Sequence, residues 1–181
     1  MYLIKNKLFK VLLTIFVFGF VIWLGGTIFR TSIAYNLFKI GPQMELKPEY
    51  TNIERINTIY LFSTTSLMTG IAYCLSVVSG SLLAVMLRKE FKDKGWIFII
   101  FCLFVFTVPI QSYFLYMDYE LANAVYYKKI LDFYHPDIQN FFVLRFKSIT
   151  NGSLRTMLLL SGFTCILYAV WQPLDNNNNR K

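Results

Sequence analysis

The sequence predicts an all-α, polytopic membrane protein: a four-helix bundle with an amphipathic helix in the second outer loop. Only 15% of its 181 residues are charged and 56% are hydrophobic, whereas about 25% of an ordinary soluble domain is charged. Its mean hydropathy is +0.48. Four apolar runs are long enough to cross a bilayer as helices. The formal charge of +8 does not indicate nucleic-acid binding, because the basic residues lie between the apolar runs and form no basic stripe.

The four spans are expected at residues 11–29, 59–87, 96–117 and 156–171, so residues 1–175 form one transmembrane domain. The second run would be about 43 Å long as a helix, so it must tilt or project beyond the bilayer. A basic start before an apolar run also resembles a signal peptide. However, this run outlasts the roughly 7–15 residues of a signal-peptide core, and we expect an uncleaved first helix. Residues 176–181 carry nothing apolar to bury and are predicted to be a disordered tail.

The distribution of Lys and Arg predicts the orientation. With a cytoplasmic N-terminus, the inner segments hold nine basic residues in about 27 positions, and the outer segments hold nine in about 67. The tight basic loop at residues 88–94 is the strongest cytoplasmic marker. Both termini are therefore expected in the cytoplasm, with the protein in the cell membrane, or the inner membrane of a bacterium.

The second outer loop, residues 118–155, contains the predicted amphipathic helix. Its apolar residues recur near helical spacing: Ile138, Phe141, Phe142, Phe146 and Ile149. Asp137, after Pro136, is a plausible N-cap or first-turn acid. The helix is expected either to cap the bundle by packing onto it or to bind a partner.

Small residues at intervals of four predict where the helices approach one another, because close backbone contact holds helices together in lipid. The predicted helix-packing residues are Gly25, Gly26, Ala72, Ser76, Gly80, Ala84, Ser161, Cys165 and Ala169. We expect the ridge on the second span to lie inside the protomer. A homodimer seam is the alternative.

Metal, redox and carrier chemistry have little support in the sequence. The cysteines, Cys74, Cys102 and Cys165, fall in three different spans without a Cys-x-x-Cys pair, and His135 is the single histidine. No charged residue falls in the middle of a predicted span, as ion-coupled carriers generally require. The sequence therefore predicts no metal site, no cofactor and no catalytic residue.

Polar residues gather instead at the outer ends of the spans, where the four helix ends of a compact bundle converge. The predicted ligand- or partner-binding residues are Arg30, Tyr35, Gln111, Tyr113, Tyr116, Asp118, Glu120 and Arg145, with Arg155 at the same level. An Arg30–Asp118 pair is geometrically reasonable. These residues either pair and cap the bundle, or line a pocket for an anionic or zwitterionic head group.

The sequence favours a non-enzymatic accessory or structural subunit that binds another membrane component through its outer loops. The alternative is the protomer of an oligomeric channel or small transporter, with a pathway formed only by a homo-oligomer. A lipid-modifying enzyme would need a motif that the sequence lacks. The expected partners are the lipid bilayer and another membrane protein or a second copy of the chain, with no nucleic acid.

Overall fold

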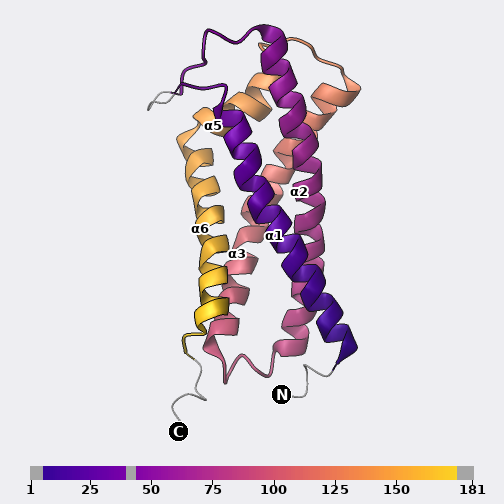
Figure 1. The fold of residues 1–181 in the computed structure, drawn as a ribbon, viewed down its shortest axis with the longest axis vertical. Helices are drawn as coiled ribbons and strands as arrows, with labels where there is room; N and C mark the ends of the chain where they lie inside the picture. The colour runs from indigo at the N-terminus through magenta and orange to yellow at the C-terminus, as the bar shows by residue number, and fades with distance from the viewer. Residues whose placement is uncertain (1–5, 40–43, 175–181) are drawn as a thin grey trace.

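The computed structural model describes residues 6–39 and 44–174, and they form an all-helical bundle. Four long helices, α1 (Lys7–Tyr35), α2 (Asn52–Leu87), α3 (Gly95–Ala122) and α6 (Ile149–Trp171), run along its long axis (Figure 1). Each is long and apolar enough to cross a membrane. The predicted fold class and the multi-pass membrane character are therefore confirmed. The tail predicted at residues 176–181 lies outside the described residues.

The bundle has two different ends. The described part of the chain begins and finishes at one end, beside the loop between α2 and α3; we call this the termini end (Figure 1). The other, the cap end, carries the remaining connections and four short helices. These are η2 (Asn123–Tyr127), which continues α3, and then α4 (Pro136–Ile138), η3 (Gln139–Val143) and α5 (Leu144–Lys147).

At the cap end the long helices extend beyond the predicted spans. Helix α2 begins at Asn52 rather than at residue 59, because Thr51 and Glu54 form a capping box. The Glu54 carboxylate accepts from the Thr51 N–H at 2.8 Å, and the Thr51 hydroxyl accepts from the Glu54 N–H at 3.3 Å. Helix α6 begins at Ile149 rather than at residue 156.

Helices α1 and α2 form the more extensively packed pair, through small residues. A Cβ on Gly19 would lie 2.7 Å from the Ala72 carbonyl oxygen and also collide with Ser76, and one on Gly26 would collide with the Thr69 side chain. Gly80 approaches Phe16 and Phe104. Gly25 does not belong to this seam. It is exposed, and nothing lies near its Cβ position, since it points about 100° away from Gly26 on the helix.

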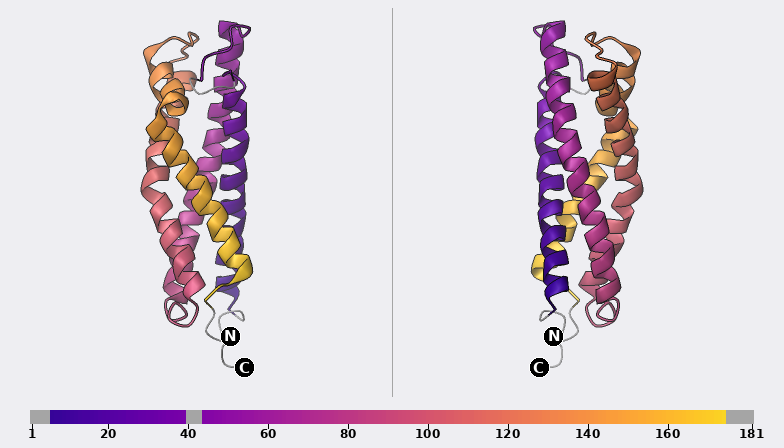
Figure 2. Two further views of the ribbon diagram at one scale, coloured as in Figure 1. Left: turned by 90° about the vertical axis from the view of Figure 1, so that its left-hand side faces the viewer. Right: turned by 90° about the vertical axis from the view of Figure 1, so that its right-hand side faces the viewer.

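Helices α3 and α6 form the second pair (Figure 2). Ser161 and Cys165 of α6 are buried, and the Cys165 thiol lies 3.8 Å from the Ile100 carbonyl oxygen of α3. Ala169, expected on the same ridge, is exposed. Ala72 and Ser76 of the α2 ridge are buried within the protomer, and Ala84 is half-buried.

The segment predicted as an amphipathic helix folds into the core of the cap end. Ile138, Phe142 and Phe146 are buried there and pack with Phe62 of α2. Ile149 was expected on the same face but is 87% exposed. The reason is local: Ser148 has an extended ψ of 126°, which ends α5 and starts α6 in a new direction.

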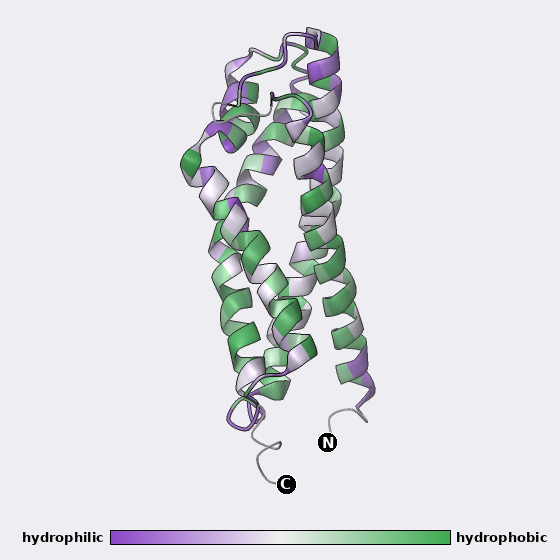
Figure 3. Cartoon of the chain, turned by 60° about the vertical axis from the view of Figure 1, so that its left-hand side comes forward, coloured by the Kyte–Doolittle hydropathy of each residue, from purple (hydrophilic) through white to green (hydrophobic). Residues whose placement is uncertain are grey.

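Hydrophobic residues make up the bundle over most of its length (Figure 3). Large hydrophobic side chains from all four long helices point outward, among them Phe18, Met68, Phe106 and Val170. A soluble domain rarely exposes such a continuous apolar surface, but hydrocarbon chains are its natural solvent. Green, hydrophobic segments dominate the middle of the bundle; purple, hydrophilic ones gather toward the cap end and, at the termini end, in the loop between α2 and α3 and at the start of α1.

Candidate ligand site at the cap end

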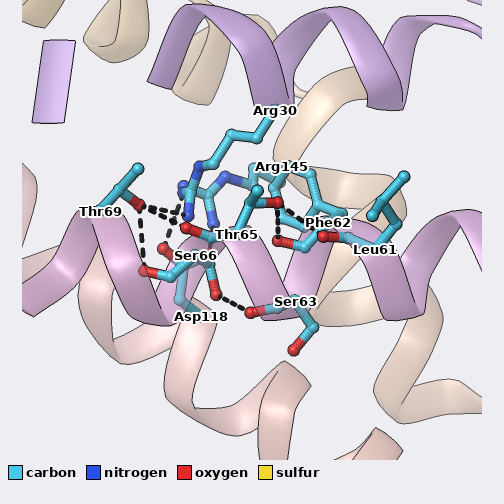
Figure 4. Close-up of polar contacts among 9 residues, drawn as sticks. All are labelled: Arg30, Leu61, Phe62, Ser63, Thr65, Ser66, Thr69, Asp118 and Arg145. Carbon is cyan, nitrogen blue, oxygen red and sulfur yellow. Dashed lines mark hydrogen bonds and ion pairs between the residues drawn. The ribbon is translucent and has the colours of Figure 1, made fainter. Parts of the chain in front are cut away.

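Two arginines meet one carboxylate inside the bundle. Arg30 of α1 donates to Oδ2 of Asp118 of α3 at 2.7 Å, and Arg145 of α5 donates to Oδ1 of the same carboxylate. All three side chains are at least nine-tenths buried. Figure 4 shows them converging beside α2. We call Arg30, Asp118 and Arg145 the buried triad.

Hydroxyl groups and aromatic rings complete the surroundings of the triad. Arg30 also reaches the Thr69 hydroxyl at 3.4 Å, and its guanidinium lies 4.8 Å from the centre of the Phe62 ring. The Arg145 guanidinium lies 4.7 Å from the Phe114 ring. Such cation–π contacts offset part of the hydration free energy that arginines lose on burial.

The electrostatics of the triad leave one positive charge in excess. Burial lowers the pKa of Arg145 to about 10, although Asp118 opposes this shift, so the guanidinium stays charged at neutral pH. Two guanidinium groups then face one carboxylate in a region that water does not reach. Removing one partner from such a buried cluster is costly, because it leaves an uncompensated charge.

The helices continue past the triad toward the cap end, which places the ion pairs inside the bundle and not at its rim. About 20 helical residues span the hydrocarbon, so counting from Trp96 at the termini end places Asp118 close to the other hydrocarbon boundary. Thr69 and Arg30 are at the same level by the same count on α2 and α1. The predicted Arg30–Asp118 pair is present, and Arg145 joins it.

The other predicted binding residues do not share one pocket with the triad. Gln111 is buried, whereas Tyr113 and Tyr116 are exposed on the outer face of α3, and Glu120 is half-exposed. Helical geometry explains the split, since residues two positions apart point about 200° from each other. Two of the expected pocket walls, Tyr113 and Tyr116, therefore point away from the triad and belong to the exposed surface of the bundle.

A separate polar cavity of about 280 Å³ lies at the start of α6; it includes Tyr35 and Arg155 of the predicted polar group, whereas Lys147, Ser148 and Thr156 were not predicted. Its polar lining comes from Tyr35, Lys147, Ser148, Arg155 and Thr156. The Arg155 guanidinium donates to the Tyr35 hydroxyl at 2.6 Å and stacks 4.9 Å from the centre of the Phe146 ring. The available signal was the sequence from Lys147 to Arg155, in which basic and hydroxyl residues lead into an apolar helix.

The connections at the cap end are held together by long-range hydrogen bonds. Asn52 donates to the Leu131 carbonyl at 3.1 Å and accepts from the Phe133 N–H at 2.9 Å. Its amide therefore binds the connection between η2 and α4 to the start of α2. Arg55 donates to the Tyr134 hydroxyl at 2.7 Å and to the Lys47 carbonyl at 2.9 Å. The connection that contains Lys47, before α2, and the connection between η2 and α4 therefore form one folded cap around the start of α2.

His135 and the three cysteines, considered above for metal or redox chemistry, lie on four different helices or their caps. The His135 Nδ1 accepts from the Asp137 N–H at 3.2 Å and so caps α4. Cys74 and Cys102 are exposed on the apolar surface, and Cys165 is buried. Within residues 6–39 and 44–174, no group of three His, Cys, Asp or Glu side chains is placed to hold a metal ion.

A larger cavity, of about 610 Å³, opens at the termini end. Side chains of α1, α2, α3 and α6 line it, including Phe16, Leu83, Phe101 and Ile166. Its lining is almost entirely apolar, with Glu90 and Lys94 paired to each other at its rim. It offers room for hydrocarbon but no set of polar groups.

Comparison of this chain with protein-family models, with curated proteins and with solved structures found no match.

Proposed function

We propose that this protein is a non-enzymatic, multi-pass membrane subunit that binds another membrane protein through its cap. One observation carries the proposal: large apolar side chains are exposed at the far tip of the cap. Ile53 is 73% exposed, Leu131 71% and Tyr134 61%. We call these three residues the cap tip.

Lipid contact does not account for the cap tip. Helix α2 has 36 residues and is about 54 Å long, and hydrocarbon covers only about 30 Å of it. Counting from Leu87 at the termini end, Ile53 lies about 20 Å beyond the hydrocarbon. Exposed apolar side chains that project this far into water are typical of protein interaction sites.

The cap also has the rigidity that a binding surface needs. Asn52 precedes Ile53 and holds the backbone at Leu131 and Phe133, while Arg55 donates to the Tyr134 hydroxyl. The cap tip is therefore presented in a fixed arrangement, and binding requires little loss of conformational entropy. The polar groups of the triad are occupied by one another, which favours a structural role for them over catalysis.

The test is the mass and composition of the complex extracted from its native membrane in mild detergent. We expect a second membrane protein to co-purify, and Ile53→Asp or Leu131→Asp to release it. Tyr127→Asp, a change of another exposed large side chain of the cap outside the cap tip, is the matched control and should retain the partner. A monomer, or a partner that both cap-tip variants retain, would contradict the proposal. A pure homo-oligomer that leaks ions from liposomes would replace it with the channel alternative.

We also infer that the termini end faces the cytoplasm, on the strength of the basic loop between α2 and α3. In a variant without the three native cysteines, Lys89→Cys and Glu49→Cys place one exposed thiol at each end of the bundle, outside the hydrocarbon. An impermeant maleimide added to intact cells should label only the thiol at residue 49. Labelling of residue 89 alone would reverse the orientation.

A further inference from the structure

We propose that the polar cavity at the start of α6 binds a phosphate group, carried by a lipid head group or free in solution. The site is built by Arg155, Lys147, Ser148 and Tyr35. This inference is independent of the proposed function, because the cavity and the cap tip share no residue.

The first argument is a surplus of positive charge at this level of the bundle. Arg30 and Arg145 share the carboxylate of Asp118. Arg155 adds a third guanidinium, and in the described part of the chain no carboxylate lies within 4.0 Å of it. Three guanidinium groups and one carboxylate leave two positive charges in excess. Next to hydrocarbon, such charges persist only where a counter-charge or a function maintains them.

The second argument is that Arg155 stands close to the triad. The ring of Phe146 stacks on Arg155 at 4.9 Å and packs on Phe62 at 5.8 Å, and Phe62 in turn lies 5.4 Å from Arg145. An anion in the cavity would therefore offset the field of the whole cluster.

The third argument is the set of donors around the cavity. The Tyr35 hydroxyl accepts from Arg155, so its own hydrogen is free to donate. The Ser148 hydroxyl precedes α6 without capping it. Lys147 adds a second cation, and the described residues that line the cavity include no Asp or Glu. Donors from several directions suit the tetrahedral oxygens of phosphate, and Arg pairs with phosphate more strongly than with neutral acceptors.

The fourth argument is the depth of the cavity. Counting about 20 residues of α6 from Trp171 reaches Asn151, so the cavity lies at the hydrocarbon boundary, where lipid phosphates are found. The cavity volume of about 280 Å³ accommodates a head group but not a pair of acyl chains. Beside the cavity, Ile149 and Met157 are exposed and can contact the chains of the same lipid.

The experiment uses the full chain, delipidated in a non-ionic detergent, with the thermal unfolding midpoint as the signal for binding. Three probes are titrated: dioctanoyl phosphatidylglycerol, inorganic phosphate, and dioctanoyl glycerol, which lacks the phosphate. We expect a saturable rise in midpoint with the phospholipid and none with the diacylglycerol. If inorganic phosphate gives the same rise at a similar concentration, the ligand is free phosphate and not a lipid.

Variants separate the site from general attraction to a basic protein. Lys147→Gln, at an exposed position that leaves the fold intact, should weaken binding about fivefold, and Arg155→Gln should weaken it about tenfold or more. Lys129→Gln removes the same charge from the cap outside the cavity and should have no effect. If neither phosphate probe shifts the midpoint, or if Lys129→Gln weakens binding as much as Lys147→Gln does, the proposal is wrong. Should Arg155→Gln fail to fold, the comparison of the two lysines still decides the outcome.

Discussion

The Arg30 guanidinium lies 2.7 Å from the Asp118 carboxylate, although 88 residues separate them in the chain. This contact ties the α1–α2 pair of helices to the α3–α6 pair at the cap end. Arg145 reaches the other oxygen of Asp118 from α5. One carboxylate therefore joins three segments of the protein.

Neutralising this carboxylate should destabilise the protein strongly. Asp118→Asn keeps the shape of the side chain but leaves two buried arginines without a counter-charge, which costs about 3–5 kcal/mol. Thermal unfolding in detergent should show a large loss of stability. Glu120→Gln, two residues further on α3 and half-exposed, should change stability by less than about 0.5 kcal/mol. Equal effects of the two substitutions would show that the triad does not hold the bundle together.

The close approach of α1 and α2 predicts opposite responses at two glycines of the same helix. Gly19→Ala should cost about 1–3 kcal/mol, because the new methyl group meets the Ala72 carbonyl and the Ser76 side chain. Gly25→Ala should be neutral or stabilising, since Ala favours helix and nothing lies near the added atom. The unfolding midpoints of the two variants check this. A destabilising Gly25→Ala would indicate an interface that a single chain does not contain.

The sequence was sufficient to predict the spans and the Arg30–Asp118 pair, because both follow from hydropathy and from the convergence of helix ends. The predicted spans begin further along the chain than helices α2 and α6 do, since Asn52, Asn57, Asn151 and Arg155 make the first two turns of these helices polar. The capping box at Thr51 and Glu54 was a readable signal for α2. Hydropathy cannot distinguish Gly25 from Gly26, or predict the break at Ser148 that exposes Ile149, because both depend on the direction in which each residue faces its neighbours.

The cap depends on the amide of Asn52. Asn52→Ala removes a donor to Leu131 and an acceptor for Phe133, and it should destabilise the cap by about 1–2 kcal/mol. Limited proteolysis should then cut residues 128–135 faster while the spans remain protected. Asn57→Ala changes an exposed amide on the same helix and should leave the cleavage rate unchanged. Unchanged cleavage in the Asn52 variant would mean that the loop is held by other contacts.

The exposed Lys128–Asp137 ion pair predicts a pH dependence. The hydrogen bond from Lys128 holds the pKa of Asp137 below its ordinary value, and the same bond raises the pKa of Lys128. The stabilisation is therefore complete above the ordinary aspartate pKa, about 4, and is lost as the pH falls through the lower value of the folded state. It is also lost at alkaline pH, once Lys128 is deprotonated.

The measurement is the difference in unfolding midpoint between the unmodified protein and Lys128→Gln, followed with pH. The difference should be constant near neutrality and disappear well below pH 4. Lys129→Gln serves as the reference for a plain change in net charge. A difference that persists unchanged in acid would show that Lys128 does not stabilise the protein through Asp137.

The buried triad is completed only late in biogenesis. Arg30 is synthesised 88 residues before Asp118, and Arg145 follows 27 residues after it. While the chain is being inserted, the first helix thus carries an unneutralised arginine close to the hydrocarbon until the third helix arrives. A chain that stops before Asp118 keeps this charge exposed, and one that stops before Arg145 lacks the second donor. Arrested translation products of this protein therefore differ from the finished chain by an unpaired charge at the level of the triad. The quality control of membrane proteins can recognise such a charge within the membrane.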